Sequence, residues 1–217
     1  MIQAVVFDLD GVIIDTEEVW EDVRRAYVAE HGKRFRPDSQ QRMMGMSTGE
    51  WSRHLSADLG VGRTPEQVAA DVLGRMAERY RQSLPLIPGS VDAVRRLGER
   101  FTLALASSSA RILIDQVLAT AGLAEAFRVT LSTEEVSRGK PAPDVYLEAV
   151  SRLGLTPRAC VAIEDSSNGL RSAAAAGVAV VAVPHGVYPP APDALAKAAL
   201  VIDSLDDLTT EAIEKLG

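Results

Sequence analysis

Short apolar runs recur along the 217-residue chain, and they are the feature that most constrains its fold. Each run is rich in Val, Ile, Leu or Ala, and segments of helix length separate most of them; the runs cover residues 3–7, 102–106, 160–163, 178–183 and 200–202. Strands that are apolar on both faces are typical of a parallel sheet covered by helices on both sides. The alternation over residues 88–217 therefore predicts an α/β fold with a doubly wound parallel sheet.

Residues 15–87 interrupt this alternation with helical signals alone. Three capping-box patterns occur in this stretch, at residues 15–18, 47–50 and 64–67. A capping box marks the first turn of a helix, so we expect a helical bundle inserted after the first strand. The predicted organisation is a core of residues 1–14 and 88–217 and an inserted helical domain of residues 15–87.

Composition limits the classes of function. The chain has 23 basic and 30 acidic residues, a net charge of −7, which argues against nucleic-acid binding. A single cysteine, Cys160, excludes an internal disulfide and favours a reducing compartment. The longest uncharged apolar run near the C-terminus, residues 178–184, is too short to span a bilayer, and the acidic N-terminal segment is unlike a signal peptide. We expect a soluble cytoplasmic protein without membrane or nucleic-acid partners.

Pairs of acidic residues follow two of the predicted strands. Asp8 and Asp10 come directly after the first run, with Gly11 next, and Glu164 and Asp165 follow the run at 160–163. Open α/β sheets bind ligands beyond the carboxyl ends of their strands, and carboxylates gathered there suit Mg²⁺. Taken singly, each pair could instead be a turn or a helix cap.

Two further signals lie at corresponding positions. Ser107, Ser108 and Ser109 follow the second core strand, where hydroxyls and backbone N–H groups that open a helix can bind an anion. Lys140 stands between Gly139 and a proline, which restricts it and could fix a positive charge among the acids. Alone, the serines could be helix caps and the lysine a solvated surface residue.

In this order, the four signals resemble the haloacid dehalogenase superfamily over the whole chain. The resemblance rests on Asp-x-Asp-Gly-Val at residues 8–12, Ser107, Lys140 in Gly-Lys-Pro-x-Pro-Asp, and the Glu164-Asp165 pair. The insertion is similar to the helical cap of the β-phosphoglucomutase-like subgroup. The segment Asp15–Trp20 is similar to the start of hexose-phosphate phosphatases of that subgroup.

The resemblance implies a role for each matching residue. Asp8 would be the nucleophile that takes the phosphoryl group, and Asp10 the acid and base. Ser107 and Lys140 would hold the phosphoryl oxygens. Mg²⁺ would be bound by Asp8, the backbone carbonyl of Asp10, and Asp165, with Glu164 binding it directly or through an intervening group. These six residues form the predicted chemical centre.

The cap implies a second set of residues that contact the substrate. Gly45, Ser47 and Thr48 fall where the cap sends a loop toward the substrate, and Ser108 belongs to the predicted anion site. Trp20 could stack on a sugar face or simply pack the cap helix, and both interpretations stay open.

The mutases of the subgroup have an arginine where this chain has Thr48. A threonine cannot replace a bidentate phosphate clamp, unless Arg42 or Arg53 substitutes from nearby.

The favoured hypothesis is therefore a Mg²⁺-dependent phosphatase that acts through an aspartyl-phosphate on a small phosphorylated metabolite, with a sugar phosphate as the expected substrate. The chain would be a monomer or a weak homodimer. A phosphosugar mutase is the first alternative. A non-enzymatic phospho-acceptor module is a remote one, because such modules are shorter and lack a cap.

Overall fold

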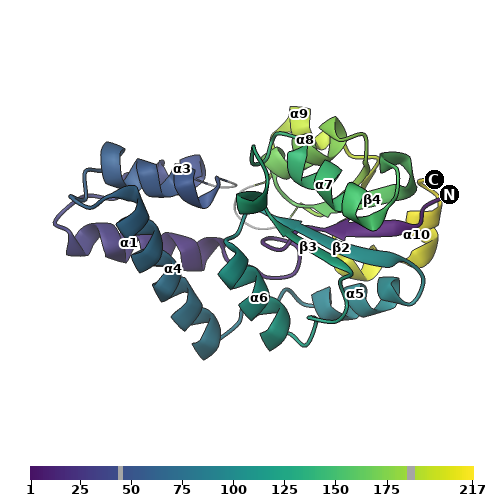
Figure 1. The fold of residues 1–217 in the computed structure, drawn as a ribbon, viewed down its shortest axis with the longest axis horizontal. Helices are drawn as coiled ribbons and strands as arrows, with labels where there is room; N and C mark the ends of the chain where they lie inside the picture. The colour runs from purple at the N-terminus through teal and green to yellow at the C-terminus, as the bar shows by residue number, and fades with distance from the viewer. Residues whose placement is uncertain (44–45, 185–188) are drawn as a thin grey trace.

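A six-stranded parallel sheet lies at the centre of the larger part of the molecule (Figure 1). The computed structural model describes residues 1–43, 46–184 and 189–217. The strands follow the order β3-β2-β1-β4-β5-β6, with bounds β1 Ala4–Phe7, β2 Thr102–Ser107, β3 Val129–Ser132, β4 Cys160–Glu164, β5 Ala179–Ala182 and β6 Leu200–Val201. The predicted fold class is confirmed.

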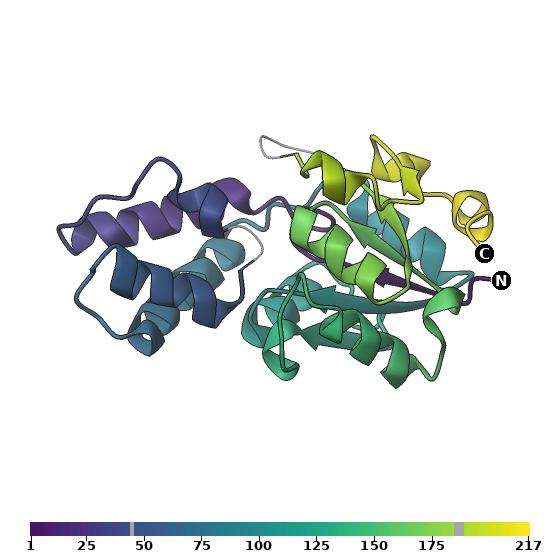
Figure 2. The ribbon, with the colours of Figure 1, turned by 90° about the horizontal axis from the view of Figure 1, so that it is seen from above.

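Helices cover both faces of this sheet. Figure 1 and Figure 2 show them as layers on either side of the strands; the bounds are α5 Ser90–Gly98, α6 Arg111–Thr120, α7 Asp144–Leu153, α8 Ser167–Ala175, α9 Pro192–Leu195 and α10 Thr210–Glu214. Short 3₁₀ turns complete the connections; these are η2 Thr133–Glu135, η3 Pro157–Ala159 and η4 Leu205–Asp207.

The two faces of the sheet present side chains of different size. Large residues such as Phe7 and Leu105 belong to the core cluster that includes α5 and α6. Small residues such as Ala104 and Ala162 belong to the cluster that includes α7 and α8. Because side chains alternate along a strand, this pattern lets α7 and α8 approach the sheet closely. Lys140, which precedes α7, is thereby brought near the strand ends.

Between β1 and α5 the chain forms a separate group of helices, called here the helical unit. Its elements are α1 Glu17–Glu30, α2 Ser39–Met43, α3 Thr48–Arg53, the π-helical turn η1 His54–Asp58 and α4 Pro65–Gln82. In Figure 1 and Figure 2 this unit lies beyond the carboxyl ends of the strands, and both termini lie at the opposite end of the molecule.

Two paired segments join the helical unit to the sheet. The backbone N–H of Ile87 donates to the carbonyl of Ile13 at 3.0 Å, and Asp15 N–H donates to Pro85 at 2.8 Å. Ile14 and Leu86 form an antiparallel bridge between these bonds. The outgoing and returning chains therefore support each other directly beside Asp8 and Asp10.

One capping prediction is wrong and another is confirmed. The pattern at residues 15–18 predicts Asp15 as the N-cap of the first helix, but α1 begins at Glu17 with Thr16 as its N-cap. The Thr16 side chain makes no capping hydrogen bond, and its hydroxyl donates to Asp10 at 2.6 Å. The predicted box at Thr64 is present, since the Gln67 N–H donates to the Thr64 hydroxyl at 3.3 Å.

The sequence analysis does not predict strand β3. It has four residues, of which Val129 and Thr130 are only half-buried, at an edge of the sheet. Such a strand lacks the continuous apolar run that identifies an inner strand.

Among the described residues, no helix is both long and apolar enough to cross a membrane.

The buried thiol of Cys160 provides a test of the core. The residue begins β4 and is 0 % exposed, and burial raises the pKa of its thiol to about 11. Because the thiolate is the reactive form, Ellman's reagent at pH 8 should leave the native protein unlabelled. One thiol per chain should react after denaturation in guanidinium chloride. Rapid labelling of the native protein would contradict the packing of β4.

Candidate active site

Carboxylates and a lysine meet at the carboxyl ends of β1 and β4, the two central strands. The register pairs Phe7 with Ile163, so the next residues along each strand, Asp8 and Glu164, lie side by side. The Asp8 N–H donates to the Ile163 carbonyl at 3.0 Å and anchors the chain there. This is also the place where the strand order reverses, the usual ligand site of an open α/β sheet.

Lys140 connects these carboxylates. Its Nζ donates to Asp8 Oδ1 at 2.9 Å, to Glu164 Oε1 at 2.6 Å and to the Ala106 carbonyl at 2.9 Å. The ammonium group is buried, so burial alone would lower its pKa. The negative charges of Asp8 and Glu164 outweigh burial and raise the pKa of Lys140 above its ordinary value. Lys140 is therefore a fixed positive charge with all three of its donors directed.

Glu164 holds the lysine rather than facing the cavity. It is 0 % exposed, and its Oε1 also accepts a hydrogen bond from the Tyr146 hydroxyl at 2.7 Å. Its Oε2 accepts from the Ser166 hydroxyl at 3.2 Å. Gly169 makes room for this carboxylate, since a Cβ there would collide with it. Both oxygens thus have protein donors.

Asp165 differs from Glu164 in having an unsatisfied oxygen. Its Oδ1 is buried and has no hydrogen-bond partner among the described residues. Burial, followed by the negative charges of Glu164 and Asp8, raises the pKa of Asp165 well above its usual value. A buried acceptor without a donor is costly unless a cation satisfies it.

Asp8, Glu164 and Asp165 can place one carboxylate oxygen each within 4.8 Å of one another, close enough to share a metal ion. The hard oxygen donors and the excess negative charge fit Mg²⁺. Gly11 has a φ of +78°, and a Cβ at this position would collide with the Asp165 carboxylate. The chain therefore leaves this space free for the carboxylate that the ion needs.

Burial and neighbouring charges together raise the pKa of Asp8 to about 8. Burial is the largest cause; Lys140 lowers the pKa, and the negative charges of Glu164 and Asp10 raise it. The charged form of Asp8 therefore needs positive charge beyond that of Lys140 to be stable near neutral pH.

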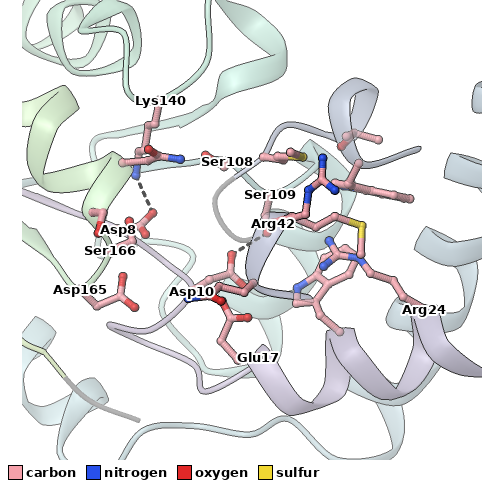
Figure 3. Close-up of a pocket in the computed structure, with 18 of the residues that line it drawn as sticks. Asp8, Asp10, Glu17, Arg24, Arg42, Ser108, Ser109, Lys140, Asp165 and Ser166 are labelled. Atoms are coloured by element: carbon pink, nitrogen blue, oxygen red, sulfur yellow. Dashed lines mark hydrogen bonds and ion pairs between the residues drawn. The ribbon is translucent and has the colours of Figure 1, made fainter. Parts of the chain in front are cut away.

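Asp10 is oriented by two hydroxyl groups from distant parts of the chain. Thr16 donates to its Oδ1 at 2.6 Å, and Ser109 donates to its Oδ2 at 2.6 Å (Figure 3). Ser109 is in turn fixed through its backbone N–H, which donates to the Ser107 hydroxyl at 3.0 Å. The carboxylate of Asp10 is thus held toward the cavity beside Asp8 rather than inside the metal cluster.

The predicted serines divide between two positions. Ser107 is 0 % exposed and does not belong to the lining of the cavity described next, whereas Ser108 and Ser109 line it. The role of Ser107 as a phosphoryl ligand stays a prediction. Sequence reasoning named Ser109 only as part of the serine run, because nothing local shows that its hydroxyl reaches a residue 99 positions earlier.

A cavity of about 500 Å³ lies between the helical unit and these strand ends. Asp8, Asp10, Lys140 and Asp165 line its sheet side. The helical unit contributes residues from α1, α2, α3 and the segment before α3; these are Glu17, Trp20, Arg24, Gln41, Arg42, Met43, Met46, Thr48 and Trp51. Figure 3 shows Arg24 on the opposite side of the pocket from Asp8 and Lys140.

The predicted cap residues are only partly brought together. Trp20 and Thr48 line the cavity, Ser47 does not, and Gly45 lies outside the described residues. Ser47 instead lies beside Gly139, the residue before Lys140. A Cβ built on Gly139 would be 3.8 Å from the Cβ of Ser47. Trp20 is 8 % exposed and its ring lies 5.8 Å from that of Trp51, so it packs the helical unit and lines the cavity at once.

Comparison with known proteins identifies the family. The model of the haloacid dehalogenase-like hydrolases matches residues 5–183, a range that holds the whole chemical centre. The chain belongs to this family. It is 31 % identical over 189 residues to hexitol phosphatase B of Escherichia coli K12, a match that covers 84 % of each protein.

Two further similarities extend this result. The chain is 32 % identical over 209 residues to the bifunctional riboflavin kinase/FMN phosphatase of Arabidopsis thaliana; this covers 95 % of the chain but only 54 % of that longer protein. The crystal structure of β-phosphoglucomutase from Clostridium difficile superposes with a TM-score of 0.84 at 24 % identity, covering 100 % of this chain and 97 % of the other. That last likeness concerns the fold.

Membership of the haloacid dehalogenase-like hydrolases was predicted from the four signals and is confirmed. Sequence reasoning missed the hydrogen bond from Thr16 to Asp10, the hydrogen bond from Tyr146 to Glu164, and the pair Glu17 and Arg24 in the helical unit. A signal for the last pair was present, because residues seven apart lie on one face of a helix.

The variant Gly11→Ala should show whether the acidic cluster binds a metal, independently of a change in overall stability. The new Cβ would displace Asp165, so we expect Mg²⁺ affinity, measured by calorimetric titration, to fall about tenfold or more. Gly154→Ala is the matched control, because its φ of +72° is similar but nothing lies within 4 Å. Both variants should lose roughly 1 kcal/mol of stability through the positive φ. Unchanged Mg²⁺ affinity in Gly11→Ala would refute the cluster as a metal site.

Proposed function

We propose that the protein is a Mg²⁺-dependent phosphatase that hydrolyses a small phosphorylated metabolite, a sugar phosphate, through an aspartyl-phosphate. The observation that carries the proposal is the buried ammonium of Lys140 bound to Asp8, beside the unsatisfied oxygen of Asp165, on the floor of a closed-over cavity. A fixed cation next to a nucleophilic carboxylate is what stabilises the charge of a transferring phosphoryl group.

Asp8 is the proposed nucleophile because it lies at the cavity floor with one oxygen fixed by Lys140. Its carboxylate attacks phosphorus, the bond from phosphorus to the leaving oxygen breaks, and Asp10 gives that oxygen a proton. In the second half, Asp10 takes a proton from water, whose oxygen attacks the same phosphorus and frees Asp8. Thr16 and Ser109 keep the Asp10 carboxylate in place for both transfers.

Asp8, Asp165 and the backbone carbonyl of Asp10 would hold Mg²⁺, with Glu164 at the edge of the site. When bound, the ion supplies positive charge that neutralises the phosphoryl oxygens. Because Lys140 and Tyr146 already occupy Glu164 Oε1, we infer that Glu164 acts mainly by holding the lysine. The cluster of three carboxylates supports the proposed metal site.

The helical unit supports a small substrate. We propose that residues 15–87 form a cap domain over a core of residues 1–14 and 88–217, since the cavity is lined from both parts. A volume of about 500 Å³ fits a metabolite rather than a macromolecule, and a cap excludes bulk water from the reaction. The name of the relative hexitol phosphatase B favours a polyol or sugar phosphate.

The cytoplasmic location and the monomer or weak homodimer stay predictions.

Phosphate release from a panel of sugar and polyol phosphates tests the proposal. We expect Mg²⁺-dependent turnover that EDTA abolishes and that Asp8→Asn reduces by about 10³-fold or more, because the nucleophile is lost. Asp203→Asn is the control, since Asp203 is exposed and far along the chain from the site. Turnover that survives both EDTA and Asp8→Asn would contradict the mechanism.

A phosphosugar mutase is the alternative to distinguish, because Arg42 lines the cavity although Thr48 is neutral. Incubation with β-glucose 1-phosphate and its bisphosphate primer, followed by phosphorus NMR, separates the two activities. We expect free phosphate and no glucose 6-phosphate, because the neutral threonine at position 48 cannot clamp a second phosphate. Isomerisation faster than phosphate release would favour the mutase. A stable phosphoprotein without turnover would instead favour the phospho-acceptor module.

A further inference from the structure

Arg24 is a buried cation without an ion-pair partner among the described residues. It is 5 % exposed, lines the cavity, and contributes to none of the ion pairs found between described side chains. Its Nε is buried and has no hydrogen-bond partner in the described part of the chain. Burial lowers the pKa of Arg24 to about 10, which leaves it protonated near neutral pH. The mechanism proposed above makes no use of it.

Two tryptophans and a glutamine fix the guanidinium in place. Its central carbon lies 4.4 Å from the ring centroid of Trp20 and 5.2 Å from that of Trp51. One terminal nitrogen donates to Gln40 Oε1 at 3.3 Å. These contacts use the planar faces and one edge of the group. Nε is buried, whereas Nη2 makes no hydrogen bond to a described residue and is not fully buried, so Nη2 remains available to a molecule in the cavity.

Glu17 accompanies Arg24 on the same face of α1. Seven residues, two turns of helix, separate them, and both line the cavity. The amide nitrogen of Gln40 donates to a Glu17 carboxylate oxygen at 2.9 Å, so Gln40 holds both members of the pair. The pair thus offers a fixed acceptor and a fixed donor to one molecule in the pocket: Figure 3 shows Arg24 across from Asp8 and Lys140, and Glu17 beside Asp10.

We propose that Glu17 and Arg24 form a subsite for hydroxyl groups of the leaving alcohol, and that they select a polyhydroxylated leaving group over one that carries a second anionic group. This inference rests on the phosphatase function proposed above. An alcohol hydroxyl both donates and accepts hydrogen bonds. It can therefore accept from Arg24 Nη2 and donate to a Glu17 carboxylate oxygen.

The surrounding charges disfavour a second anion at this position. The carboxylates of Glu17 and Asp10 both act electrostatically on Arg24, and they would repel a phosphate or carboxylate placed between them. Thr48 adds no positive charge on this side. Arg42 is exposed and lies 3.8 Å from Asp38, so its charge is already partly balanced.

The ratio of two activities tests the subsite. We expect Arg24→Gln to lower kcat/KM for a hexitol phosphate about 10- to 100-fold more than for p-nitrophenyl phosphate, whose leaving group has no further hydroxyls, with the loss mainly in KM. Glu17→Gln should shift the ratio in the same direction. Arg81→Gln, an exposed arginine of α4 paired with Glu78, is the control and should change neither activity.

Two results would overturn the subsite. Equal losses on both substrates would show that Arg24 only supports packing. A larger loss on a sugar bisphosphate than on the hexitol phosphate would make Arg24 an anion clamp. Failure of the phosphatase proposal is seen separately, as an absence of Asp8-dependent release of phosphate from p-nitrophenyl phosphate by the unmodified protein.

The tryptophans provide a readout that is independent of turnover. Trp20 and Trp51 are the only tryptophans of the chain, and both flank Arg24. In the Asp8→Asn background, titration with a hexitol phosphate should change their fluorescence, whereas inorganic phosphate at the same concentration should not. The change should weaken when Arg24→Gln is added. Equal responses to both ligands would contradict the subsite.

Discussion

The ion pairs of Lys140 determine how the rest of the site is arranged. One buried ammonium faces two carboxylates, Asp8 and Glu164, and a third, Asp165, lies beside them with an unsatisfied oxygen. A single positive charge does not balance three negative ones. Burial is the main cause of the raised pKa values of Asp8 and Asp165, and the neighbouring carboxylates add to it. Lys140 thus offsets part of the negative charge of the cluster, and a divalent cation would offset the rest.

The pairing register of the strands places the carboxylates of the site next to one another. Asp8 follows β1 and Glu164 ends β4, and because these strands are paired, their carboxylates are neighbours wherever the loops lie. Lys140 reaches them because α7 packs on the face of the sheet that carries small side chains. Tyr146, on the same helix, then fixes the carboxylate that receives the lysine. Strand pairing and side-chain size therefore set the geometry of the chemical centre.

The parts predictable from sequence are those that obey a local rule. Apolar runs followed by acids placed Asp8 and Asp165 at strand ends, and membership of the family followed from their order. Contacts between distant segments obey no such rule. The hydroxyl of Thr16 could cap α1 or bind Asp10, and only the tertiary fold decides between them. Strand β3 was missed for a related reason, since an edge strand is defined by its partner as much as by its own residues.

The two sides of the cavity differ in what their charges can recognise. On the sheet side, Lys140 and the carboxylates are held by backbone pairing and by one another, so this side suits the phosphoryl group that all substrates of a phosphatase share. On the opposite side, Arg24 is held by aromatic rings and Gln40. The groups that hold it belong to the helical unit, which joins the sheet through two short paired segments. A change in this unit can therefore alter the leaving group that is accepted without disturbing the charges that carry out the reaction.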